Sequence, residues 1–165
     1  MCLYTQDIYP SIAEKDITCY KMVKLIYHDM MTPYMNLPLS DKILRGEELL
    51  CADEAKRTIF NEFFSLNEIR SGYIHTYSSF GEVKMAVIHE QTAYINPFIS
   101  PLLIAYECII PKGSEYYEGY SENGTYYSLI YKSKKNMPLN SYASDKIKFV
   151  RKITDMEMFG YERRK

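Results

Sequence analysis

The sequence predicts an α+β fold, in which a mostly antiparallel twisted sheet carries two packed helices at about residues 53–65 and 80–91. Apolar residues that alternate with a period of two from Ile17 onward indicate a strand. Apolar residues at helical spacing within 53–65 indicate an amphipathic helix. A Pro-Lys-Gly-Ser turn at 111–114 divides residues 102–120 into two runs of strand-forming residues.

The length and composition favour one domain spanning residues 1–165. A chain of 165 residues is about one domain long, and it can bury roughly two thirds of the surface of its unfolded form. The chain has 17 Tyr and 7 Phe but no Trp, and this Tyr-rich set favours strands over helices. We find no internal repeat, low-complexity segment or domain linker, so we expect a single domain.

The first strand is predicted to follow an irregular N-terminal arm, residues 1–15, which contains a turn signal around Pro10. From Asp16 the segment ITCYKMVKLIY alternates, with Cys19, Lys21 and Val23 on one face of a strand. Lys21 interrupts this apolar face. We interpret it as an edge lysine whose stem is buried while its amine reaches water, and the alternative is a lysine in a binding pocket.

The segments between this strand and residue 65 are predicted to be a connection, an ambiguous segment and a helix. Residues 28–41 contain several breakers and indicate the connection. Residues 42–51 fit either a hairpin with Gly46 in its turn, which we favour, or a helix broken at that glycine. The helix at about 53–65 rests on apolar residues at helical spacing and on acids at its start, where they suit the helix dipole. These residues are Ala55, Ile59, Phe60, Phe63 and Phe64, preceded by Asp53 and Glu54.

A strand is predicted at residues 73–77, immediately before the helix at 80–91. Ser79 and Glu82 have the spacing of a capping box, in which each side chain accepts a hydrogen bond from a main-chain N–H at the start of a helix. In 102–120 we predict a central strand that turns at 111–114 into its neighbour in the sheet.

The C-terminal part is predicted to add further strands. An Asn-Gly pair at 123–124 is a strong hairpin signal, and the segment TYYSLIY that follows indicates a strand. The last strand, KIKFVRKI, alternates so that Ile147, Phe149 and Arg151 share one face. Residues 154–165 are expected to form a tail or a short helix.

The charge balance argues against a nucleic-acid-binding protein. There are 20 basic and 21 acidic residues, and the formal net charge is −1. A protein that relies on a global basic field to attract phosphates would carry a clear excess of basic residues.

The cysteines and the apolar runs predict a cytoplasmic protein with no cofactor and no membrane contact. Cys2, Cys19, Cys51 and Cys108 are widely spaced and form neither a Cys-x-x-Cys pair nor a Cys/His cluster, so no metal site is expected. Cys19 and Cys108 lie in strand-like runs, and we interpret them as small core residues. The start of the chain shows no secretory signal pattern, which favours a reducing cytoplasm. No apolar run approaches the ~20 residues that a membrane span needs.

The sequence contains no complete catalytic motif. We find no Gly-x-Ser-x-Gly, no phosphate-binding loop, no dinucleotide Gly-x-Gly-x-x-Gly and no His-Glu-x-x-His. His75 lies within a predicted strand and has no second ligand at metal-binding spacing. We interpret it as a hydrogen-bonded core or surface histidine.

Most of the chain resembles a set of uncharacterised small proteins from gut Bacteroidales and their phages. The shared features are a start like MCLYTQ, the segment DITCYK, the strand GYIH, the segment ECIIPKGS and the segment YASDKI near the end. This resemblance carries no known activity, and it implies an accessory protein of a phage or mobile element in the cytoplasm of the host cell.

A shorter part resembles ADP-ribosyltransferase-like domains. Glu107 followed by CIIPKGS is similar to the family's catalytic Glu before a strand and a Pro-x-Gly-Ser turn, and GYIHTYSSFGEVKMA is similar to the segment that holds the nicotinamide ribose. The resemblance implies that Glu107 polarises the ribose 2′-hydroxyl of NAD and stabilises an oxocarbenium-like state. Ala105 stands where the family often has an acid or Gln. The candidate ligand-binding residues are Tyr20, Lys21, Tyr73, His75, Thr76 and Ser78.

We therefore expect a small soluble accessory protein that acts by binding. It would neutralise a host protein or sequester a small nucleotide, in a counter-defence role, and its Tyr-rich composition suits a protein interface. The expected partner is a host or phage protein or a small nucleotide, and self-association is left open. The alternatives are an NAD-using enzyme centred on Glu107 and a structural component of a virion.

Overall fold

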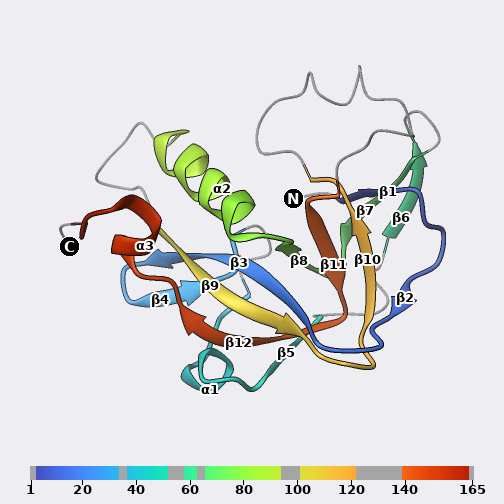
Figure 1. Ribbon diagram of the computed structural model, residues 1–165, viewed down its shortest axis with the longest axis horizontal. Helices are drawn as coiled ribbons and strands as arrows, with labels where there is room; N and C mark the ends of the chain where they lie inside the picture. The colour runs from blue at the N-terminus through green and yellow to red at the C-terminus, as the bar shows by residue number, and fades with distance from the viewer. Residues whose placement is uncertain are drawn as a thin grey trace.

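Strands dominate the computed structural model, which describes residues 3–33, 37–51, 58–62, 66–93, 101–121 and 139–163 (Figure 1). The larger sheet contains β2 (Ser11–Ile12), β3 (Ile17–Ile26), β4 (Asp29–Met31), β5 (Glu48–Leu50), β8 (Ile74–Tyr77), β9 (Leu102–Ile110), β10 (Glu115–Gly119), β11 (Ser141–Ser144) and β12 (Lys146–Lys152). The smaller sheet contains β1 (Leu3–Thr5), β6 (Thr58–Glu62) and β7 (Leu66–Ser71). The helices are α1 (Asp41–Leu44), α2 (Phe80–Ala93) and α3 (Asp155–Phe159).

All the strand pairs of the described residues are antiparallel. Eight strands of the larger sheet follow the order β2-β10-β11-β8-β3-β9-β12-β5, and β4 pairs with β3. The smaller sheet has the order β1-β7-β6. The predicted fold class, a mostly antiparallel sheet with helices in a single domain, is confirmed.

The larger sheet turns through a corner where three strands pass directly into the next strand of the chain. β2 leads into β3, β9 into β10 and β11 into β12, and in Figure 1 β3, β9 and β12 run crosswise to β10 and β11. Main-chain bonds fasten the corner: Ala13 N–H donates to the Ser114 carbonyl at 2.9 Å, and Asp145 N–H donates to the Glu115 carbonyl at 3.0 Å. The predicted pairing of β9 with β10 is therefore wrong, because the 111–114 turn carries the chain around a corner instead of closing a hairpin.

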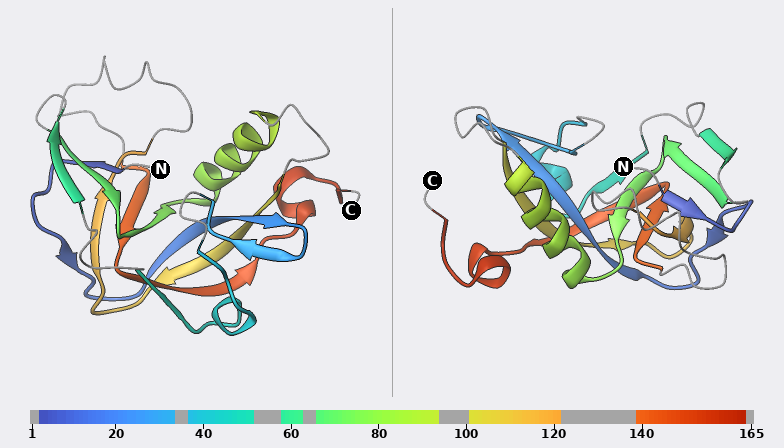
Figure 2. Two further views of the ribbon diagram at one scale, coloured as in Figure 1. Left: turned by 180° about the vertical axis from the view of Figure 1, so that it is seen from behind. Right: turned by 90° about the horizontal axis from the view of Figure 1, so that it is seen from above.

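The two faces of β3 and β9 contribute to different cores. One face, which we call the core face, joins side chains from both sides of the corner, such as Cys19, Ile74, Cys108 and Phe149. The other, which we call the helix face, is covered by α2 (Figures 1 and 2). A third cluster joins the smaller sheet to β10 and β11. Its members are Leu3, Ile69, Tyr73, Tyr117 and Ala143.

The helix predicted at 80–91 is confirmed as α2, and it begins as its sequence suggests. The hydroxyl of Ser79 accepts a hydrogen bond from Glu82 N–H at 3.3 Å, which satisfies one free donor of the first turn. The Glu82 carboxylate accepts from the side-chain amide of Asn140 at 3.5 Å. Val83, Ala86 and Val87 then pack on the sheet.

The helix predicted at about 53–65 is wrong over residues 58–62, which form β6. β6 pairs antiparallel with β7, so a neighbouring strand satisfies its main-chain groups. Thr, Ile and Phe in this segment are residue types that favour strands. Pairing with β7 therefore decides the structure of the segment, although its apolar residues have helical spacing. The remainder of the predicted helix lies outside the described residues.

Two other N-terminal expectations are corrected. The arm 1–15 was expected to be irregular, but it supplies β1 and β2, each paired with a strand from later in the chain. Within 42–51 the favoured hairpin is wrong, because the helical turn α1 ends at Leu44, Gly46 follows with φ 104°, and β5 comes next. The strands predicted around Ile17–Ile26, Ile74–Tyr77 and Lys146–Lys152 are confirmed. The Asn-Gly turn at 123–124 and the strand after it lie outside the described residues.

Candidate functional site

The predicted site residues are divided between the two faces of β3. Tyr20 and Lys21 are consecutive residues of one strand, so their side chains point to opposite faces. Glu107 pairs with Tyr20 in the β3–β9 ladder and lies with it on the helix face. Lys21 lies on the core face with Cys19, and Thr76 lies on the same face of β8 as the core residue Ile74. The structure thus brings Glu107 together with Tyr20, and not with Lys21 and Thr76.

A bulge in β12 places Arg151 beside Glu107. Phe149 pairs with Cys108 and faces the core, whereas Arg151 pairs with Glu107 and so lies on the opposite face. The sequence predicted Phe149 and Arg151 on one face. That alternation is wrong because the bulge adds one residue to β12 between them.

The carboxylate of Glu107 is held by a positive charge. Arg151 Nε lies 3.1 Å from Glu107 Oε2, and Arg151 Nη1 lies 2.9 Å from Glu157 Oε1 on α3. The Glu107 side chain is 28% exposed. The hydrogen bonds that Arg151 donates to the Glu157 carboxylate raise the pKa of Arg151, and Glu107 adds to the effect. A carboxylate already paired with a guanidinium is less available to stabilise a second developing positive charge.

Tyr20 borders Glu107 and the start of α2. Its ring centroid is 6.3 Å from that of Phe80. Burial raises the pKa of the Tyr20 phenol, and the negative charge of Glu107 raises it further. This phenol therefore stays protonated near neutral pH and can serve as a hydrogen-bond donor.

Lys21 lies where the pairing between β3 and β8 ends. Tyr20 and Tyr77 form the only ladder pair between these strands in the described residues, and Lys21 Nζ donates to the His75 carbonyl at 2.7 Å. The amine thus bonds a carbonyl next to the point where the ladder ends. Lys21 is 7% exposed, so the interpretation as an edge lysine with an amine in water is wrong, because β3 is an inner strand. Burial lowers its pKa to about 8, which leaves it mostly protonated at pH 7.

Two buried thiols lie beside Lys21. Cys19 and Cys108 are directly opposite each other in the β3–β9 ladder. Burial raises the pKa of Cys19 to about 12 and that of Cys108 well above its usual value, while the charge of Lys21 opposes both shifts. Both are core residues, as the sequence predicted.

His75 is buried as a neutral imidazole. Burial lowers its pKa to about 3, and the positive charge of Lys21 adds to this shift. Neither ring nitrogen has a hydrogen-bond partner among the described residues, so the expected hydrogen-bonded histidine is not what this part of the chain contains. His75 pairs with Ala143 of β11.

Tyr73 and Ser78 have positions that fit the packing of the fold. Tyr73 stacks edge-on against Tyr117, with ring centroids 5.5 Å apart, in the cluster under the smaller sheet. Ser78 lies between β8 and α2, and its main-chain N–H donates to the Asn140 carbonyl at 2.9 Å.

A buried polar network around Asn140 was not expected from the sequence. Asn140 Oδ1 accepts from Ser121 N–H and from the Ser141 hydroxyl, each at 2.9 Å. The hydroxyls of Ser121 and Ser141 also bond to each other. Small polar residues in loops are too common for their spacing to predict such a network, and only the meeting of β10, β11 and α2 reveals it.

Comparisons with known proteins give no match: no family model, no curated protein and no solved structure is similar to this chain. Among the described helices, none has the length and apolar character needed to cross a membrane. The described residues contain no cluster of three or more His, Cys, Asp or Glu side chains that could hold a metal ion.

Proposed function

We propose that this protein acts by binding a protein partner, as an accessory protein of a phage or mobile element that neutralises a host protein. The observation that carries the proposal is Tyr27, at the tip of the β3–β4 hairpin. Its side chain is 92% exposed and its backbone φ is 56°, a region that few residues other than glycine adopt. Strained backbone that presents an exposed aromatic is typical of functional sites, and Tyr is enriched among the residues that dominate binding energy.

The residues beside Tyr27 suit an interface. Leu25 and Ile26 before it, and Met30 and Met31 after it, are all half-buried apolar side chains. Methionine side chains are flexible and adapt to differently shaped partners. A protruding aromatic with an adaptable apolar border is what an anchor residue in a partner's pocket requires.

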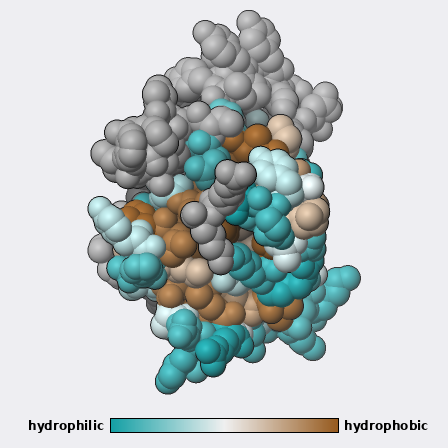
Figure 3. Space-filling model, turned by 90° about the vertical axis from the view of Figure 1, so that its left-hand side faces the viewer, coloured by the Kyte–Doolittle hydropathy of each residue, from teal (hydrophilic) through white to brown (hydrophobic). Residues whose placement is uncertain are grey.

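Further apolar side chains are exposed on α3 and the segment after it. Met156 is 54% exposed and Tyr161 is 60% exposed. Figure 3 views the side of the molecule on which α3 and the β3–β4 turn lie in Figure 1, and hydrophobic areas are spread across it among hydrophilic ones. Exposed apolar surface of this kind supports an interaction site.

The alternative, an NAD-using enzyme centred on Glu107, has less support. The implied reaction needs a carboxylate free to accept the ribose 2′-hydroxyl and to face an oxocarbenium-like charge. Arg151 is already paired with this carboxylate, and the candidate ligand residues Lys21 and Thr76 lie toward the other face of the sheet.

A thermal-shift experiment separates protein binding from the two nucleotide hypotheses. NAD and cyclic nucleotides are added to the wild type and to Glu107→Gln, and we expect no rise in melting temperature for either protein. A ligand at 100 times its Kd would add about 2.7 kcal/mol of stability. A rise with any nucleotide would favour sequestration, and a rise that Glu107→Gln abolishes would favour the enzyme.

The role of Tyr27 is tested by affinity capture from the cells that harbour the protein. We expect a specific protein to be retained by the wild type, and its retention to fall at least tenfold with Tyr27→Ala, in line with a loss of about 1.4 kcal/mol or more. Tyr9→Ala is the matched control, because Tyr9 is 80% exposed but lies beside β2, away from the hairpin. Equal retention by all three proteins would contradict this role of Tyr27.

A further inference from the structure

The core face of β3 and β9 carries an unusual set of side chains. Cys19 and Cys108 are fully buried, directly opposite each other and free of disulfide bonds. Lys21, two residues after Cys19, points to the same face. Its buried ammonium donates to a main-chain carbonyl, and it is not among the ion pairs of the described residues. A buried cation without an anionic partner is costly, so its position next to two thiols needs an explanation.

The main-chain hydrogen bonds of β9 fix the kind of pair that the two cysteines form. Leu103 N–H donates to the Gln91 side chain, and the Ala105 carbonyl accepts from Ile153 N–H. The main-chain groups of these residues therefore point away from β3. Because direction alternates along a strand and the β3–β9 register is unbroken, the main-chain groups of Cys108 point toward β3. Cys19 and Cys108 are thus a hydrogen-bonded pair.

In a pair of this kind the two thiols are far enough apart to bind one ligand between them. Residues in such a pair have Cα atoms about 5.5 Å apart and Cβ atoms roughly 4.5–5.5 Å apart. A disulfide needs Cβ atoms only about 3.8 Å apart. The two sulfurs are therefore better placed to hold an atom between them than to bond directly to each other.

We propose that Cys19 and Cys108 form a two-coordinate site for a soft monovalent metal ion, Cu(I), with Lys21 as the compensating charge. Thiolate ligands favour Cu(I). Two thiolates and one Cu(I) carry a net charge of −1, and the ammonium of Lys21 brings the buried cluster to zero. Binding releases both thiol protons to solvent, and copper remains Cu(I), so no oxidant or reductant is consumed.

A competition experiment tests the site. Reduced protein is loaded with Cu(I) without oxygen and titrated with the Cu(I) chelator bathocuproine disulfonate. We expect one tightly held Cu(I) per chain in the wild type, and the same in a Cys2→Ser/Cys51→Ser double variant, which keeps only the opposed pair. Cys19→Ser and Cys108→Ser should each bind at least 100-fold more weakly. Loss of binding in the double variant, or none in the wild type, would overturn the proposal.

Two measurements test the geometry and the charge of the site, and neither needs a serine at the buried positions Cys19 and Cys108, where it might prevent folding. The X-ray absorption spectrum of the Cu(I)-loaded double variant should show two sulfur neighbours, and a third sulfur or a nitrogen neighbour would contradict a two-coordinate site. Lys21→Met should keep its fold by circular dichroism and bind Cu(I) 10- to 100-fold more weakly, as outer partners of metal sites do when they are removed. Unchanged affinity in Lys21→Met would rule out the compensating role of the lysine.

Discussion

At the scale of a single residue, His75 makes the free energy of unfolding depend on pH. Its folded pKa is about 3 and its reference value is 6.5, so between these values the unfolded chain binds a proton that the folded chain does not. The stabilisation is complete above pH 6.5 and is lost as the pH falls toward 3. At pH 5 the loss is about 2 kcal/mol, from 1.36 kcal/mol per pH unit over 1.5 units.

Urea unfolding at pH 7 and pH 5 measures this effect. Between pH 7 and pH 5 we expect the free energy of unfolding of His75→Leu to fall by about 2 kcal/mol less than that of the wild type. This difference does not depend on how stable the variant is at pH 7. His28→Gln is the control, because it removes a histidine that is exposed in the turn of the β3–β4 hairpin and not buried. A wild-type curve parallel to that of His75→Leu would show that His75 is protonated equally in both states.

Single residues were predictable where their environment is local. The alternation of β3 was enough to place Cys19 and Val23 in the core. The sequence did not reveal that Lys21 is buried, because burial depends on β3 having β8 on one side and β9 on the other. Nor did it reveal that Arg151 meets Glu107, because a bulge leaves no mark in the residue pattern.

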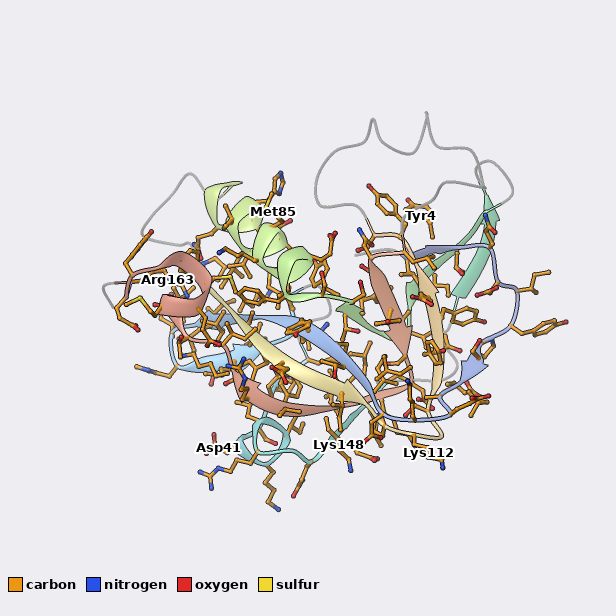
Figure 4. All side chains as sticks on the ribbon, viewed as in Figure 1. Tyr4, Asp41, Met85, Lys112, Lys148 and Arg163 are labelled. Carbon is orange, nitrogen blue, oxygen red and sulfur yellow. The ribbon has the colours of Figure 1, made fainter. Side chains whose placement is uncertain are left out.

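At the scale of elements, α3 is a five-residue helix held by its cap and by two arginines. Glu157 N–H donates to the Thr154 hydroxyl at 3.2 Å, and Thr154 N–H donates to Glu157 at 2.9 Å, which completes a capping box. Arg163, labelled in Figure 4, donates to Asp155 at 2.8 Å and lies over the Phe159 ring. A helix this short is not stable alone, so these side-chain contacts and the buried Met158 maintain it.

Thr154→Ala should therefore loosen α3 selectively. We expect a loss of about 1 kcal/mol, the usual cost of replacing a threonine cap with alanine. Amide hydrogen exchange should become roughly fivefold faster in α3, as this energy implies, and stay unchanged in α2. Thr154→Ser keeps the accepting hydroxyl and should restore protection. Equal acceleration in α2 would mean that α3 opens only when the whole fold does.

Elements were predictable where their own hydrogen bonds or a simple period define them. Ser79 and Glu82 mark the start of α2 in the sequence, and the residues of β3 follow a period of two over its central part. The segment 58–62 has helical spacing and strand-forming residues at once, and only pairing with β7 decides between them. The 111–114 turn has hairpin composition, yet hydrogen bonds to Ala13 and Asp16 direct it around the corner.

At the scale of the whole molecule, the smaller sheet meets the larger one where β1 approaches the end of β10. Tyr4 N–H donates to the Tyr120 carbonyl and Tyr120 N–H donates to the Tyr4 carbonyl, each at 2.8 Å. Figure 4 shows Tyr4 close to the ends of β10 and β11. This contact joins the N-terminus of the described chain to a strand more than a hundred residues away, and no local pattern predicts it.

Gly119 makes this approach possible. A Cβ atom built on Gly119 would overlap the Tyr4 carbonyl oxygen, which is main chain and cannot turn aside, and would also crowd the Leu3 side chain. We expect Gly119→Ala to cost roughly 1–3 kcal/mol or more, as overpacking does, measured by chemical denaturation. Gly81→Ala is the matched control, since a Cβ there meets nothing closer than 3.9 Å and alanine favours a helix by roughly 0.5–1 kcal/mol, so this variant should be as stable as the wild type or more stable. If Gly119→Ala were as stable as the wild type, β1 would have to dock on β10 less closely than the geometry of Tyr4 and Tyr120 requires.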